Sequence, residues 1–229
     1  MAGEPRKISS EMLAEDPFHP ARLDFEKGMS AAPSFALFLI GANVLAYSWE
    51  VASGALKTKE SIIAAGAIYG PKVLAGQSWR LFTGMFLHGS ASHLIGNCLA
   101  LYILGMASQR AWGPWRALLI YFTTGLCASF LSATCQSMPA VGASGAIFGL
   151  SGAIIAFFYR YSGSFFIRSR RIGSALMGWA AFDFVMGSVT PYVDHWAHLG
   201  GLAAGLVAGF ILPSALFEPA PAREGISPE

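Results

Sequence analysis

The stretch ALLIYFTTGLCASFLSATCQSMPAVGASGAIFGLSGAIIAFFY, residues 117–159, decides the fold because it contains no Asp, Glu, Lys or Arg. A helix needs about 20 residues to cross the hydrocarbon core of a bilayer. These 43 residues are therefore long enough for two crossings. The polar segment Gln136–Pro139 separates the two halves and predicts a tight loop. We expect a membrane protein built from helices.

The composition of the whole chain agrees with this expectation. The chain has 229 residues, of which 54% are hydrophobic and 12% charged, whereas about 25% are charged in ordinary soluble domains. Half of the 28 charged side chains lie in residues 1–30 and 218–229, so the middle has too little polar surface for a water-soluble globule. A net charge of +2 without a basic stripe excludes the usual kind of nucleic-acid binder. Disordered, collagen-like and disulfide-scaffold proteins are excluded by composition as well.

Runs of sequence with few charges predict an all-α membrane protein with six transmembrane helices. We place the spans near residues 34–50, 92–110, 115–135, 144–161, 171–189 and 194–214. Residues 34–214 would form the membrane domain. Residues 1–33 would form a cytoplasmic N-terminal tail without a cleavable signal peptide, and residues 215–229 a mobile C-terminal tail.

The distribution of basic residues predicts the orientation of the helices. Arginines flank the second and fourth loops, whereas the third and fifth loops have no Lys or Arg. The positive-inside rule therefore places both tails and loops two and four in the cytoplasm. The first loop is an exception because it contains basic residues together with apolar stretches, and we expect it to be partly embedded in the bilayer. Its basic residues are Lys57, Lys59, Lys72 and Arg80.

Polar residues inside a bilayer are costly, so each is a candidate for function. His93 and Asn97 lie four residues apart and therefore on one face of the second predicted helix. Ser144 lies at the start of the fourth helix and His198 near the start of the sixth. The second, fourth and sixth spans cross the membrane in the same direction. We therefore expect His93, Ser144 and His198 at similar depth, near one leaflet.

Small residues predict that the fourth and sixth helices approach closely. In lipid, small side chains at a helix interface allow the two backbones to come together. Such an approach would bring Ser144 within hydrogen-bond reach of His198, and a serine hydroxyl becomes a good nucleophile when an imidazole removes its proton. Backbone N–H groups beside Ser144, together with His93 and Asn97, would supply donors for an oxyanion. The small residues are Gly145, Gly149 and Gly152 in one helix and Gly201, Gly205 and Gly209 in the other.

These motifs, taken together, resemble those of the rhomboid intramembrane serine proteases. The motifs are His93 with Asn97, Gly142-Ala143-Ser144-Gly145, Ala197-His198 followed by Gly201 and Gly205, and Trp79-Arg80 in the first loop. The resemblance covers about residues 34–214. It implies a six-helix rhomboid core and a Ser–His dyad without an acidic third member, with Ser144 as nucleophile and His198 as general base. His93, Asn97 and the Ser144 backbone N–H would bind the oxyanion.

The resemblance also implies a substrate and supporting residues. The substrate would be a single-pass membrane protein, cleaved at or within its transmembrane segment. Independently of the resemblance, we expect that no metal, cofactor or nucleic acid takes part. Phe148 occupies a position where family members often have an aromatic residue that packs on the catalytic imidazole. His195 occupies a position where Asn is common. A bacterial inner membrane is the expected location, although an organelle is an alternative.

Other interpretations of the same residues remain open at this point. Ser144 could be a packing residue, and His198 could donate to a carbonyl at a helix interface. The chain could also be an inactive relative that binds membrane proteins, a carrier that uses Asp183, or a transporter or metal site that uses His88, His93, His195 and His198. A zinc protease is disfavoured because no His-Glu-x-x-His pattern occurs. For single residues we expect a structural hydrogen bond at His88, an outward-facing His195 and a helix N-cap at Asp194.

Overall fold

The computed structural model describes residues 22–166, residues 193–217 and a few positions between 169 and 178. In these parts of the chain the secondary structure is helical, apart from two isolated β-bridges. This confirms the prediction of an all-α protein. Within residues 22–166 and 193–217 the helices of four residues or more are α1 (Ser34–Ser53), α2 (Lys59–Ala65), α3 (Gly70–Leu74), α4 (Arg80–Thr83), α5 (Ala91–Cys135), α6 (Ser144–Arg160) and α8 (His195–Ile211).

Helices occupy the places of the first, second, third, fourth and sixth predicted membrane spans. The first, fourth and sixth spans correspond to α1, α6 and α8, and the second and third spans both lie in α5. Among the residues that the structure describes, two helices, α1 and α5, are long and apolar enough to cross a membrane by length and composition, and α6 and α8 are shorter apolar helices. The predicted fifth span lies mostly outside the described residues, and Asp183 is among the residues outside them. The count of six therefore stays a prediction.

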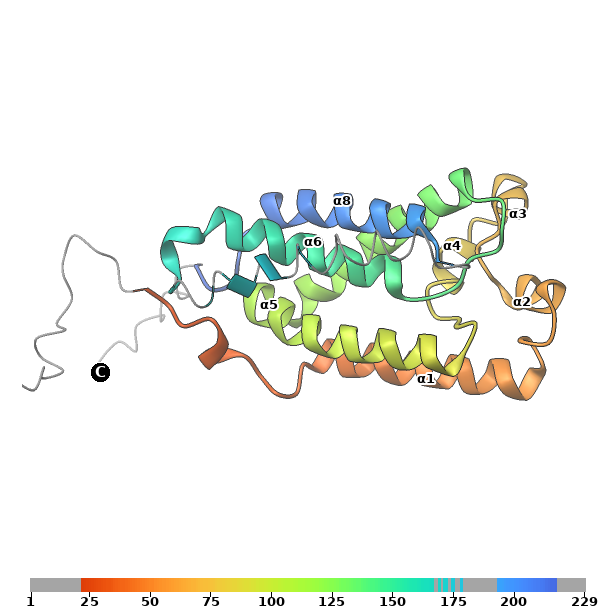
Figure 1. Cartoon of the computed structure of the whole chain (residues 1–229), viewed down its shortest axis with the longest axis horizontal. Helices are drawn as coiled ribbons and strands as arrows, with labels where there is room; N and C mark the ends of the chain where they lie inside the picture. The colour runs from red at the N-terminus through yellow and green to blue at the C-terminus, as the bar shows by residue number, and fades with distance from the viewer. Residues whose placement is uncertain are drawn as a thin grey trace, which may run out of the picture.

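Helix α5 consists of two helical segments joined at a sharp break. Gly113 has a φ of 77° and a ψ of 169°, a backbone conformation that side chains other than that of glycine rarely tolerate. Pro114 follows and has no N–H to donate to the preceding turn. The chain turns back at this point (Figure 1), so that the two predicted spans are joined by a single non-helical residue.

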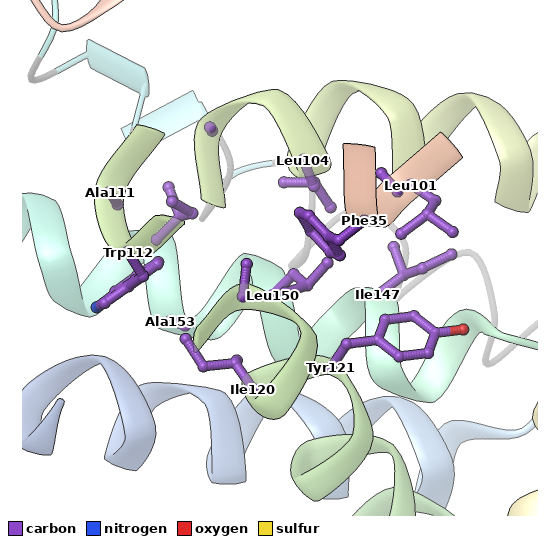
Figure 2. Packing of buried hydrophobic residues seen from close by; sticks show 14 of the residues in the cluster. Phe35, Leu101, Leu104, Ala111, Trp112, Ile120, Tyr121, Ile147, Leu150 and Ala153 are labelled. Carbon is purple, nitrogen blue, oxygen red and sulfur yellow. The ribbon is translucent and has the colours of Figure 1, made fainter. Parts of the chain in front are cut away.

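The apolar core lies between α1, the two segments of α5, and α6. Figure 2 shows large side chains from these helices meeting in one cluster. The labelled members are Phe35, Leu101, Leu104, Ala111, Trp112, Ile120, Tyr121, Ile147, Leu150 and Ala153. On the outer faces, by contrast, Leu45, Trp115 and Ile211 are 73%, 80% and 70% exposed. Large exposed apolar side chains on several helices are what contact with lipid requires.

The first loop is a folded unit that contains α2, α3 and α4. The buried guanidinium of Arg80 donates hydrogen bonds to the carbonyl oxygens of Ile63 and Ala67, at 2.5 and 3.2 Å, and holds the loop together. The loop is also tied to the segment that precedes α6. Ile68 and Ala140 exchange two backbone hydrogen bonds, at 2.9 and 2.8 Å. The expected insertion of this loop into the bilayer stays a prediction.

Candidate active site

Helices α6 and α8 are in backbone contact along the glycine residues that the sequence singled out. A Cβ atom on Gly201 would overlap the carbonyl oxygen of Gly145, and one on Gly205 would overlap that of Gly149. Figure 1 shows the two helices lying side by side. No side chain larger than that of glycine fits at Gly201 and Gly205 unless the helices separate.

The same contact brings the first turns of the two helices together. Ser144 is the first residue of α6 and is half-buried. A Cβ atom on the next residue, Gly145, would lie 3.5 Å from the carbonyl oxygen of Ala197, the residue before His198. The hydroxyl-bearing turn of α6 therefore lies against the turn of α8 that contains the candidate base.

The imidazole of His198 packs flat on an aromatic ring of α6. The ring centroids of His198 and Phe148 are 4.2 Å apart and the rings are inclined by only 14°. Phe148 lies four residues after Ser144, which places it on the same helix face one turn further along. His198 is only 8% exposed. The stacking thus holds the imidazole, shielded from solvent, against the helix that begins with Ser144.

Asp194 caps α8 and attaches it to α5. Its Oδ1 atom accepts a hydrogen bond from the backbone N–H of Ala197 at 3.0 Å, which confirms the predicted N-cap. Its Oδ2 atom accepts a hydrogen bond from the hydroxyl of Ser132, near the end of α5. The sequence did not indicate this second partner, because nothing local relates two residues 62 positions apart.

We expect Asp194→Ala to lower the free energy of unfolding by about 1–3 kcal/mol, since the substitution removes a cap and leaves the buried Ser132 hydroxyl without its acceptor. Thermal unfolding of the purified chain in detergent measures the change. Asp194→Asn is the matched control, because it keeps an oxygen that can cap the helix, and it should lose less than half as much. Equal losses in the two variants would contradict the capping role.

The side chains of His93 and Asn97 lie next to Gly142, in the segment that leads into α6. Ser90 caps α5 by accepting a hydrogen bond from the backbone N–H of His93 at 3.2 Å, which fixes the first turn. A Cβ atom on Gly142 would lie 2.9 Å from the Nε2 atom of His93 and 3.5 Å from the Nδ2 atom of Asn97. Gly142 also has a φ of +132°, which favours glycine. The structure therefore places two side chains with N–H donors next to the backbone that precedes Ser144.

His88 is a fully buried histidine in the loop before α5. Its Nδ1 atom lies 3.0 Å from the carbonyl oxygen of Phe86, and its Nε2 atom lies 3.0 Å from the Nδ2 atom of Asn97. Burial, and to a lesser extent the neighbouring His93, lower the pKa of His88 to about 4, so the ring is neutral at pH 7. The expected structural hydrogen bond is present, and one of its two partners is a candidate site residue.

Glu50 is a residue of this region that the sequence reasoning missed. It is fully buried near the end of α1, and its two carboxylate oxygens accept a hydrogen bond from the backbone N–H of His88 at 3.0 and 3.1 Å. A carboxylate at the last position of the predicted span 34–50 is the signal in the sequence that could have indicated it.

His195 and a metal site were two further hypotheses from the sequence. His195 begins α8 and is half-buried, whereas its neighbour Trp196 is exposed. Within residues 22–166 and 193–217, no group of three His, Cys, Asp or Glu side chains is arranged to hold a metal ion.

Comparisons with known proteins identify relatives of this chain. A family model described as the Rhomboid domain matches residues 75–215. The chain is 32% identical over 180 residues to Rhomboid protease GluP of Bacillus subtilis (strain 168), covering 79% of this chain and 35% of that protein. It is 36% identical over 154 residues to RHOMBOID-like protein 6, mitochondrial, of Arabidopsis thaliana, covering 64% and 48%. It is 32% identical over 144 residues to Rhomboid protease AarA of Providencia stuartii, covering 55% and 51%.

The matched region includes all four candidate residues, His93, Asn97, Ser144 and His198. The chain spans between about a third and a half of the length of these three relatives. Because the family model covers more than half of the sequence, the chain belongs to the rhomboid family of integral membrane proteins.

Proposed function

We propose that this chain is an intramembrane serine endopeptidase that cleaves the transmembrane segments of single-pass membrane proteins through a Ser144–His198 dyad. The observation that carries the proposal is the stacking of His198 on Phe148, one helical turn from Ser144. Two of the relatives are named rhomboid proteases, which supports the same activity.

The proposed reaction is a two-step acyl transfer. The Ser144 hydroxyl attacks the substrate carbonyl carbon while His198 takes its proton, and His198 then gives that proton to the departing amine. Water releases the acyl group by the same route in reverse. The negative charge on the carbonyl oxygen is stabilised by N–H groups of His93, Asn97 and the Ser144 backbone. The position of His93 and Asn97 beside Gly142 supports this assignment.

The proposed activity requires a membrane domain that holds the site. Residues 34–214 form a six-helix domain, in which residues 171–189 supply the fifth span; the helices at five of the six expected places support it. Gly142, Gly145, Gly201 and Gly205 support the site by allowing backbones to approach. The dyad reaction needs no metal or cofactor. A bacterial inner membrane stays a prediction, because the relatives include both bacterial proteins and one named as mitochondrial.

A fluorophosphonate probe tests the dyad without knowledge of the substrate. We expect the probe to label Ser144 in the purified chain, because an activated serine attacks phosphorus, and we expect His198→Ala to reduce the labelling rate by at least about a hundredfold. Peptide mass spectrometry after labelling measures both the site and the extent. Equal labelling of the parent chain and of His198→Ala would remove His198 as the base.

A further inference from the structure

The hydrogen bonds of His88 determine which of its two ring nitrogens carries the proton. The carbonyl oxygen of Phe86 can only accept, so the Nδ1 atom 3.0 Å away must be the N–H donor. In the neutral ring the Nε2 atom is then an acceptor. The atom of Asn97 that lies 3.0 Å from Nε2 must therefore be the amide nitrogen and not the oxygen.

This requirement fixes the orientation of the Asn97 carboxamide. An asparagine side chain can place either its oxygen or its nitrogen at a given position by a half-turn of the amide group. Only the nitrogen can donate to His88, and a primary amide has a second N–H to offer. The same Nδ2 atom faces Gly142, at 3.5 Å from the position of a Cβ there. The reversed orientation would lose the bond to His88 and present an oxygen lone pair toward a developing oxyanion.

The position of His88 is itself fixed from two sides. The carboxylate of Glu50 in α1 accepts the backbone N–H of His88 with both oxygens, and the Phe86 carbonyl holds the ring. The side chains of this hydrogen-bonded series are at least nine-tenths buried; they are Glu50, His88 and Asn97. Water is therefore a poor substitute acceptor for the Asn97 amide.

We propose that His88 is a positioning residue for hydrolysis, which accepts one N–H of Asn97 and so directs the other toward the oxyanion. The inference rests on the proposed function and adds to it a residue that does not touch the substrate. The ring acts through Asn97, and Glu50 acts through His88.

Two isosteric substitutions separate this role from simple packing. His88→Gln places a carbonyl oxygen near the position of Nε2, and we expect it to retain most of the rate. His88→Asn keeps an N–H near the position of Nδ1 but lacks the Nε2 acceptor. We expect it to lower kcat about tenfold to a hundredfold with a smaller change in KM, because loss of one oxyanion donor costs about a hundredfold to a thousandfold. The assay is cleavage of a fluorogenic transmembrane substrate by the full chain in liposomes.

A double-mutant cycle with Asn97→Ala completes the test. If His88 acts through Asn97, His88→Asn has almost no further effect on kcat once Asn97 is alanine. The inference is overturned if His88→Asn lowers kcat by the same factor in both backgrounds, or if His88→Gln is as slow as His88→Asn. Ser144→Ala is measured in parallel. Cleavage that persists in that variant overturns the proposed function, and this inference with it, whereas equal factors in the cycle overturn this inference alone.

Discussion

Replacing Ser144 with alanine is expected to lower the rate of substrate cleavage by roughly 10⁴-fold or more, because the substitution removes the only group proposed to form the acyl intermediate. His198→Ala should cause a loss of the same order. The double variant should be no slower than either single variant, since the two groups act as a unit. Initial rates with a transmembrane substrate in liposomes, followed by gel or fluorescence, provide the measurement.

Ser151→Ala is the matched control for this experiment. Ser151 lies on the same helix, is fully buried and donates its hydroxyl to the carbonyl oxygen of Ile147 at 3.2 Å. Because α6 keeps its backbone hydrogen bonds without that hydroxyl, the control should remain active. Cleavage by Ser144→Ala at a rate near that of the parent chain would discard the dyad. A double variant whose loss of rate equals the product of the two single losses would discard it as well.

Gly201→Ala is expected to have the second largest effect, although it adds a single methyl group. That methyl group would overlap the carbonyl oxygen of Gly145, which belongs to a helix backbone and cannot rotate away. Overpacking of this kind costs about 1–3 kcal/mol. It also moves His198 away from Ser144, and a displacement of about 1 Å at a catalytic group lowers the rate about a hundredfold. We expect both a lower unfolding temperature and a rate reduced by at least that factor.

Gly41→Ala provides the matched substitution in another helix. Gly41 lies within α1, and a Cβ atom there would meet nothing within 4 Å. The variant should be as stable as the parent chain or slightly more so, because alanine favours the helix. Thermal unfolding and cleavage rates of the two variants are compared side by side. If Gly201→Ala behaves like Gly41→Ala, the close contact between α6 and α8 is not important for the site.

Several helices could be predicted from the sequence, because a helix that crosses the hydrocarbon core of a bilayer needs a long apolar segment. The starts of α1, α6 and α8 lie within one residue of the predicted starts of their spans. The connection between the second and third spans was predicted less well. A gap of several residues was expected between Arg110 and Trp115, whereas the structure has a break at Gly113 alone. The distribution of charged residues locates the spans, but it does not predict that the backbone conformation of Gly113 alone reverses the direction of the chain.

The candidate site was predictable to the extent that its members lie at helix starts. Ser144, His198 and His93 each occur in the first turn of a helix, so topology alone places them near one another. Their partners were not predictable in the same way. Glu50 and Ser132 contact the site through hydrogen bonds to residues 38 and 62 positions away, and no local spacing encodes such a contact.

The link between the first loop and the segment before α6 has a consequence for how the proposed activity would respond to distant changes. The peptide groups of Ile68 and Gly84 bond to those of Ala140 and Gly142, just ahead of Ser144, the proposed nucleophile. Residues with no proposed part in the reaction are thereby bonded to the backbone that leads to Ser144. We expect that weakening these hydrogen bonds alters the cleavage rate and leaves the helical content of the protein unchanged.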